Sequence, residues 1–220
     1  MSLLIGLDCS TKWTALGMME DGKPLGEINA ILGRRQSSQL PLMLNTLMNF
    51  WEKGTEEITH IAVTVGPGYF TGLKVGLSYA KSLAFGLGAK IIPVSTLCAL
   101  AYPHLEEGVE VASVFRAKND WVYVATYRKH NSQIMTIYEP TCVRVSEVAS
   151  ILWDKLAPNV VVLEDLSDFV LEVPTSRNVI LIKDGSVSGL NVARLGLKKI
   201  HFAVAPARVE PQYLREPDIG

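Results

Sequence analysis

The segment from residue 60 to residue 88 constrains the fold more than any other part of this sequence. An unbroken apolar run, HIAVTV at 60–65, predicts a strand buried on both faces. A glycine-rich turn, GPGYFTG at 66–72, follows it, and an apolar helical pattern then runs from 71 to 87. A buried strand that passes through such a turn into a helix is typical of α/β proteins.

Length and composition exclude several classes of protein. The 220 residues suffice for one large domain or two small ones, and a hydrophobic content of 48% with a net charge of −1 excludes a mainly disordered chain. The balance of 21 basic and 22 acidic residues predicts no overall attraction to nucleic acid. The sequence contains no run of 18 consecutive apolar residues, so it predicts no membrane span. The scattered Cys9, Cys98 and Cys142 lack metal spacing and indicate a reduced, cytoplasmic protein.

The order of predicted elements indicates two lobes. Three strands open the chain, with a hairpin turn at Asp21-Gly22, and alternating helices and strands follow. From about residue 105 the same pattern recurs in a shortened form. We therefore predict an N-terminal lobe at 1–104 and a reduced C-terminal lobe at 105–220. The expected strands are 3–9, 12–19, 24–32, 60–65, 90–94, 110–116, 120–128, 133–139, 159–163 and 178–182; the expected helices are 38–53, 71–87, one from 95, 146–156 and 186–197.

Two helices of the first lobe carry more apolar or small residues than one core-facing stripe requires. The helix at 38–53 has a broad apolar arc, which fits either a helix enclosed in its own domain or one with a second face for a partner. In the helix at 71–87, Gly72, Gly76, Ala80 and Ala84 form a stripe without bulk. That stripe allows close packing either on the sheet or on another helix across an interface.

Polar residues at the end of the first strand form the first candidate site. Asp8 is followed by Ser10 and Thr11. A carboxylate beside hydroxyl groups at a strand end can hold a hydrated magnesium ion near a phosphate. The same residues also suit a local turn in which side chains bond to the backbone.

The glycine-rich turn is the second candidate site. Gly66 and Gly68 permit close backbone approach, and Thr71 can cap the helix, whose N-terminal amides favour an anion. The spacing is not that of a P-loop. Lys74, one turn into the helix, can face an anion or solvent. The four histidines are isolated, and no nucleophile–base pair or carboxylate pair is evident, which argues for a binding role.

The ordered motifs LLIGLDCST, GPGYFTGLKVGLSYAKSLAFG, IIPVSTLCALA, VYVATY and PQYLRE resemble the bacterial TsaB (YeaZ) family over nearly the whole chain. The resemblance implies an actin-like ATPase fold, ribonuclease H-like in its sheets, with two lobes on mixed sheets and a reduced second lobe. It also implies a non-catalytic scaffold subunit for threonylcarbamoyladenosine modification of tRNA. The implied partners are a TsaD-like paralogue that carries the catalytic site and a TsaE-like ATPase, with tRNA reached only through the complex. The chain alone is expected to form a homodimer, and no association with a membrane is expected.

The resemblance further implies where partners and cofactors bind. Family dimers pack the two first-lobe helices against each other. No cofactor is expected on the isolated chain, whereas ATP or ADP with magnesium is expected at the interface between the subunits of the complex. The candidate nucleotide or phosphate contacts, taken from the two sites described above, are Asp8, Ser10, Thr11, Gly66, Gly68 and Thr71. The implied interface residues are Met43, Leu47, Phe50, Trp51, Gly72, Leu73, Gly76, Tyr79, Ala80 and Leu83.

Three positions depart from the family pattern. The catalytic paralogue has a paired-histidine metal motif, but the matching RQSSQLPLML has serines at 37 and 38 and no histidine, so no metal is expected there. Tyr69 replaces a common serine, and Arg116 begins a segment that is commonly Asp-Ala-Arg. Two other functions stay open at this stage: an independent actin-like, nucleotide-binding phosphotransferase, and a zinc peptidase, which the missing histidine pair disfavours.

Overall fold

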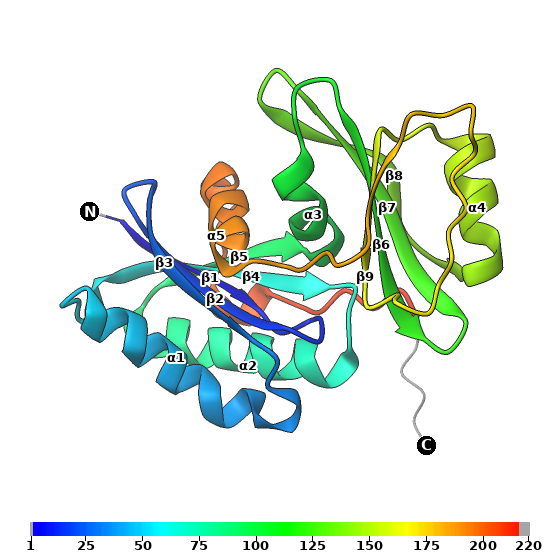
Figure 1. The fold of residues 1–220 in the computed structure, drawn as a ribbon. Helices are drawn as coiled ribbons and strands as arrows, with labels where there is room; N and C mark the ends of the chain where they lie inside the picture. The colour runs from blue at the N-terminus through cyan, green and yellow to red at the C-terminus, as the bar shows by residue number, and fades with distance from the viewer. Residues whose placement is uncertain (1, 216–220) are drawn as a thin grey trace. The chain divides into compact units, whose positions relative to one another are not determined.

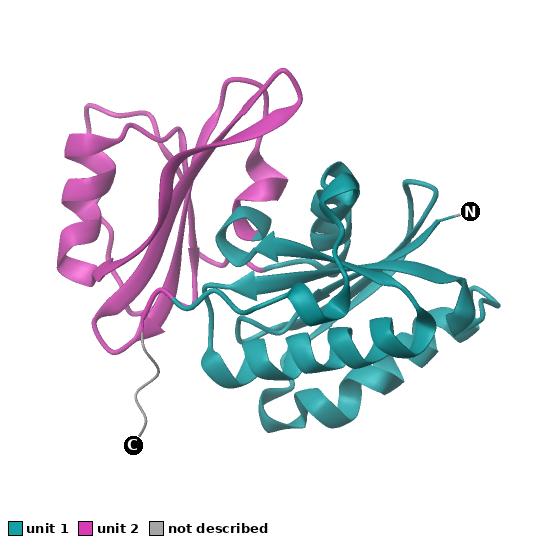
Figure 2. Cartoon of the chain, turned by 180° about the vertical axis from the view of Figure 1, so that it is seen from behind, with its two compact units in different colours: residues 1–99, 187–213 teal, residues 100–186, 214–220 magenta. Residues whose placement is uncertain are grey.

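The computed structural model describes residues 2–215, which form two compact units. The first unit contains the described chain up to Ala99 together with Val187–Tyr213, and the second contains Leu100–Ser186 with Leu214 and Arg215 (Figure 2). The predicted single boundary at 104/105 differs from this division. The structure instead ends the first unit at Ala99 and returns residues 187–213 to it, because a helix in that segment packs on the first sheet.

The first unit is built on a five-stranded mixed sheet in the order β3-β2-β1-β4-β5. The first three strands are antiparallel neighbours, as the hairpin signal at Asp21-Gly22 predicts, and β4 and β5 run parallel to β1. The strands are β1 (Leu3–Asp8), β2 (Thr14–Glu20), β3 (Lys23–Ala30), β4 (Ile58–Gly66) and β5 (Lys90–Ser95).

Helices cover both faces of this sheet. One face carries α1 (Gln36–Phe50) and α2 (Phe70–Leu87), and α5 (Gly189–Lys198) lies on the other (Figure 1). The predicted start of α1 at residue 38 is two residues late, because Arg35 and not a serine occupies the N-cap position. Among the described residues no helix is long and apolar enough to cross a membrane.

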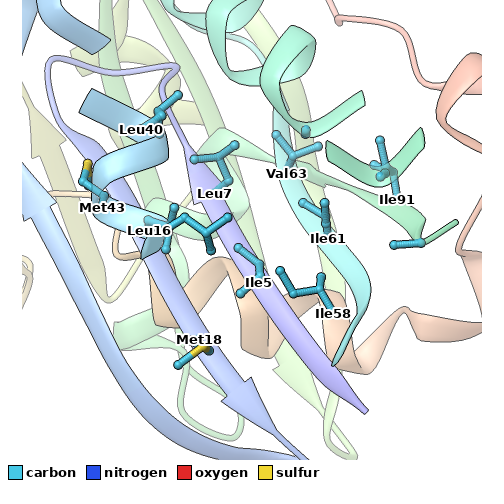
Figure 3. Packing of buried hydrophobic residues seen from close by; sticks show 14 of the residues in the cluster. Ile5, Leu7, Leu16, Met18, Leu40, Met43, Ile58, Ile61, Val63 and Ile91 are labelled. Atoms are coloured by element: carbon cyan, nitrogen blue, oxygen red, sulfur yellow. The ribbon is translucent and has the colours of Figure 1, made fainter. Parts of the chain in front are cut away.

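The core of the first unit lies between the sheet and the α1–α2 layer. Alternate residues of β1, including Ile5 and Leu7, face Leu40 and Met43 of α1 (Figure 3). This alternation is the two-residue period of a strand, and the apolar residues on the other side of β1 are left to meet α5. The first strand is therefore buried on both faces, as its unbroken apolar run predicts.

The second unit repeats the strand order of the first. Its sheet, β10-β9-β6-β7-β8, is again a three-stranded antiparallel meander whose first strand pairs in parallel with a fourth. No helix of the described residues joins β9 to β10, so this unit is the reduced one. Its elements are β6 (Glu110–Lys118), β7 (Trp121–His130), β8 (Gln133–Arg144), α4 (Val148–Ser150) with a π-turn at Ile151–Lys155, β9 (Val160–Glu164) and β10 (Ile180–Ile182).

Short segments complete the described chain. The helix α3 (Thr96–Ala101) follows β5 and leads from the first unit into the second. The 3-10 turns are Gly33–Arg35, Thr55–Glu57, Tyr102–His104, Val145–Glu147, Ile200–Phe202 and Pro206–Arg208.

The contact between α5 and the first two strands is made through glycines. A Cβ atom built on Gly6 would lie 2.1 Å from the carbonyl oxygen of Gly189, and one built on Gly17 would lie 2.3 Å from the carbonyl carbon of the same residue. Both distances are far below van der Waals contact, so backbone meets backbone here. The spacing between α5 and the sheet therefore depends on the absence of side chains at these positions.

This packing generates a stability prediction. Gly17→Ala forces α5 away from the sheet, and we expect the free energy of unfolding to fall by about 3 kcal/mol in urea denaturation. Gly86→Ala is the matched control, because Gly86 lies exposed in the last turn of α2 and nothing lies within 4 Å of a Cβ built there. That variant should be unchanged or more stable by up to about 1 kcal/mol. Equal effects of the two substitutions would contradict the glycine contact.

Candidate functional site

The carboxylate of Asp8 lies at the end of β1 and is part of a hydrogen-bond network formed within the chain. It is fully buried, and its Oδ1 accepts hydrogen bonds from Thr64 Oγ1 at 2.6 Å, from the Ser10 amide at 3.1 Å and from the Ser10 hydroxyl. Its Oδ2 accepts one from Thr11 Oγ1 at 3.3 Å. Ser10 Oγ also lies 2.8 Å from Thr96 Oγ1. Both carboxylate oxygens are thus bonded to protein donors.

The glycine-rich turn packs onto this network. A Cβ on Gly68 would lie 2.5 Å from the carbonyl oxygen of Ser10, and the Tyr69 amide donates to that same oxygen at 2.7 Å. Gly66 has a φ of +119°, and a Cβ there would lie 2.5 Å from the carbonyl oxygen of Gln212. These glycines are therefore required by contacts inside the first unit. Their presence does not depend on a ligand.

The structure brings together five of the six predicted phosphate contacts. Asp8, Ser10 and Thr11 are buried, Gly66 and Gly68 lie beside them, and Thr71 is exposed at the second residue of α2. The interpretation of Thr71 as a cap is wrong, because Tyr69 occupies the N-cap position and no side chain caps this helix. A role of these residues in binding a nucleotide stays a prediction.

Burial dominates the electrostatics at this strand end. It raises the pKa of Asp8 above its ordinary value, although the bonds from Ser10, Thr64 and Thr11 act in the opposite direction. Burial, followed by the nearby Asp8 charge, also raises the pKa of the Cys9 thiol well above its usual range. Within residues 2–215 no group of three or more His, Cys, Asp or Glu side chains is arranged to hold a metal ion. The arrangement can therefore fix the turn after β1, and each carboxylate oxygen of Asp8 accepts at least one hydrogen bond from the chain.

The outer face of α1 and α2 is the second candidate site, and it carries large apolar side chains among polar ones. Phe50 is 77% exposed, Leu42 55% and Phe85 85%. Trp51 is also exposed, and its ring packs edge-on against Phe50 with centroids 5.6 Å apart. An exposed aromatic pair such as Phe50 and Trp51 is a candidate for a protein–protein contact. We name this surface the outer face, defined by Leu42, Phe50, Trp51 and Phe85.

Most of the predicted interface residues lie inside the first unit. Glycines 72 and 76 meet Cys9 so closely that their built Cβ atoms lie 1.9 Å and 3.1 Å from its carbonyl oxygen and Cβ. The small-residue stripe therefore packs on the chain's own sheet. Six of the ten candidates are buried in this way: Met43, Leu47, Gly72, Leu73, Gly76 and Ala80. The other four remain accessible, since Phe50 and Trp51 are exposed and Tyr79 and Leu83 are half-buried.

The sequence analysis missed Leu42 and Phe85. Leu42 falls outside the apolar spacing that selected Leu47, and Phe85 falls outside the small-residue stripe. Leu42 and Phe85 could have been recognised as apolar residues at helical positions where an amphipathic helix normally has polar ones. In the second unit, Arg116 on β6 reaches the segment that follows β9: it donates to the carbonyl oxygen of Asp165 at 2.9 Å and forms an ion pair with Asp168.

Comparisons with known proteins match this fold and its motifs. A family model described as TsaD, tRNA N6-adenosine threonylcarbamoyltransferase, matches residues 28–215. The tRNA threonylcarbamoyladenosine biosynthesis protein TsaB of Bacillus subtilis is 23% identical over 155 residues, covering 70% of this chain and 68% of that protein. The protein of the same name from Haemophilus influenzae is 30% identical over 122 residues, covering 54% of this chain and 51% of that protein.

A solved structure extends the likeness in fold to almost the whole chain. YeaZ from Pseudomonas aeruginosa aligns with a TM-score of 0.81 and 22% identity over 97% of this chain and all of that one. Together with the two mixed sheets, this likeness confirms the predicted actin-like fold with its reduced second lobe. The resemblance to the TsaB (YeaZ) family is likewise confirmed.

The buried carboxylate generates a pH prediction. Because the pKa of Asp8 is raised on folding, the folded chain holds a proton that the unfolded chain releases between the ordinary value of 3.8 and the raised value. The contribution of Asp8 to stability is present at low pH and is lost as pH rises through that window. The unfolding free energy of wild type minus that of Asp8→Asn should therefore fall as pH rises from 4 towards neutrality. A difference that stays constant or rises in urea titrations would contradict the burial of this group.

Proposed function

The chain belongs to the TsaD family, whose model is described as tRNA N6-adenosine threonylcarbamoyltransferase, and we propose that it serves threonylcarbamoyladenosine modification of tRNA as a non-catalytic subunit. In this proposal it binds and activates a transferase paralogue of the same fold, which carries the catalytic site. A TsaE-like ATPase joins the two. The tRNA is contacted through the complex, and the work takes place in the cytoplasm.

The observation that carries the proposal is the outer face of α1 and α2. Phe50 of α1 and Phe85 of α2 are both exposed, and α1 and α2 lie side by side on one face of the sheet (Figure 1). Aromatic anchors surrounded by smaller contacts are the usual centre of a protein interface. The inner sides of the same helices are committed to the core, so the outer face is the part that a partner can reach.

The geometry at Asp8 favours the scaffold over an independent phosphotransferase. A phosphotransferase of this fold needs a carboxylate that can reach a hydrated metal ion, and both oxygens of Asp8 accept hydrogen bonds from the chain itself. We therefore assign any ATP or ADP with magnesium to the joint of the assembled complex. The zinc peptidase is also disfavoured, because residues 35–44 contain no histidine.

Reconstitution tests the proposed function directly. The chain is mixed with the cognate transferase and ATPase from the same organism, with tRNA, ATP, threonine-derived substrate and magnesium, and modified adenosine is measured. We expect activity only when this chain is present. Full activity without it would remove the proposal, and calorimetry showing that the isolated chain binds ATP with magnesium would favour the phosphotransferase.

Substitutions on the outer face give a sharper prediction. Phe50→Ser and Phe85→Ser should each weaken binding to the transferase by about tenfold or more, because losing an aromatic anchor costs about 2 kcal/mol. Both side chains are mostly exposed, so the melting temperature should hardly change. Phe202→Ser is the control, since Phe202 is 64% exposed in the segment that follows α5. Equal losses for all three variants would contradict the assignment of the outer face.

A further inference from the structure

The C-terminal end of α5 lies in a part of the first unit that carries no carboxylate. Residues 58–99 and 187–209 contain no aspartate or glutamate, although they supply β4, β5, α2 and α5. Two lysines and two rings are exposed where α5 ends and in the 3-10 turn that follows it. These residues are Lys198, Lys199, His201 and Phe202. Because α5 covers the face of the sheet opposite α1 and α2, this surface is separate from the outer face (Figure 1).

The chain that leaves α5 crosses the starts of three strands of the first sheet. Ile200 lines a small pocket together with residues at the start of β1. Four residues later, Val204 forms an antiparallel bridge with Ile91 of β5. Since β4 lies between β1 and β5 in the sheet, the turn Ile200–Phe202 passes the start of β4 on its way. It thereby approaches Lys90, the first residue of β5, whose side chain is exposed.

Lys90 belongs to the same face of the sheet as α5. A Cβ built on Gly196 of α5 would lie 3.7 Å from Cδ1 of Ile92, so Ile92 faces this helix. Side chains two residues apart in a strand share a face, which places Lys90 on that face as well. Burial, followed by the charge of Lys90, lowers the pKa of His60, its neighbour across the sheet. We name the basic patch by its five residues: Lys90, Lys198, Lys199, His201 and Phe202.

The three lysines of the basic patch have no carboxylate partner among the described residues. None of them forms an ion pair within residues 2–215. Asp21 lines the same small pocket as Ile200, but its Oδ1 accepts a hydrogen bond from the Ser2 amide at 2.8 Å. The patch therefore presents positive charge that no ion pair of the described chain offsets, although the overall charge of the chain is −1.

Exposed rings beside the lysines distinguish this surface from a merely charged one. Phe202 is 64% exposed, and its ring centroid lies 4.3 Å from that of His201. The negative end of the α5 dipole favours cations and accounts for Lys198 and Lys199. It explains neither Lys90 nor an exposed phenyl ring. Cations next to exposed rings suit RNA, because lysines contact phosphates and unpaired bases stack on aromatic side chains.

Resting on the proposed function, we propose that the basic patch contacts the phosphate backbone of the substrate tRNA within the assembled complex, and that an unpaired base stacks on Phe202. Three lysines reach few phosphates, so the patch adds to the contacts that the transferase makes and does not bind tRNA tightly by itself. The lysines and the ring contribute differently, because salt screens the phosphate contacts and leaves stacking almost unchanged. Transferase and tRNA also occupy different faces of the first sheet, so they do not compete for one surface.

The experiment measures binding of labelled cognate tRNA to the complex of the full chain and its transferase, by fluorescence anisotropy at several NaCl concentrations. The double variant Lys198→Glu/Lys199→Glu should weaken binding about tenfold or more, and should reduce the slope of log affinity against log salt by about 1.5. Phe202→Ser should weaken binding about fivefold or more without changing that slope. Lys155→Glu/Lys183→Glu is the matched control: it makes the same change of charge at exposed lysines of the second unit and should alter binding less than about twofold.

The outcomes separate this inference from the proposed function. Equal tRNA affinities of the patch and control variants overturn the RNA contact, as does a wild-type complex that binds tRNA no better than the transferase alone, while the scaffold function stands. A patch variant that loses the transferase in the absence of tRNA assigns the surface to a protein partner and also overturns the inference. Full tRNA modification in a mixture that lacks this chain removes the proposed function and the inference with it. Circular dichroism spectra of each variant establish that the fold is retained.

Discussion

Backbone contact at glycines holds the first unit together, because the first strand lies between helices on both sides. On one side α2 meets the end of β1 through Gly72 and Gly76, and on the other α5 meets it through Gly6 and Gly189. A strand enclosed in this way cannot tolerate side chains at the contact points. The same close packing draws residues 187–213 back to the first sheet and fixes the turn that follows Asp8.

This use of the small residues decides what remains for other molecules. Gly72 and Gly76 of the stripe on α2 pack against Cys9, and the carboxylate of Asp8 accepts hydrogen bonds from hydroxyl groups of its own loop and of β4. The carboxylate at this strand end is thus held by hydrogen bonds within the chain, while the outer sides of α1 and α2 keep aromatic residues and positive charge. A body of this kind is suited to binding another protein.

From the sequence, the order of strands and helices could be predicted more fully than which side chains are exposed to solvent. Two-residue and helical periodicities of apolar residues located the strands of both sheets and the hairpin at Asp21-Gly22. They also showed that the second lobe repeats the order of elements of the first in a shortened form, because burial imposes such patterns locally. Residues 187–213 were misplaced, since which sheet a late helix packs on depends on distant contacts. Met43 and Phe50 shared one apolar arc in sequence, and only the packing of α1 shows that the first is buried and the second exposed.

Hydrogen exchange of the chain with and without its cognate transferase tests the central claim most directly. Amides exchange more slowly where a partner excludes solvent or stabilises a helix. The account predicts new protection in peptides that cover residues 37–51 and 70–86, with the β7–β8 hairpin of the second unit unchanged. Protection confined to the second unit, or absent from both helices while the complex forms, would contradict it.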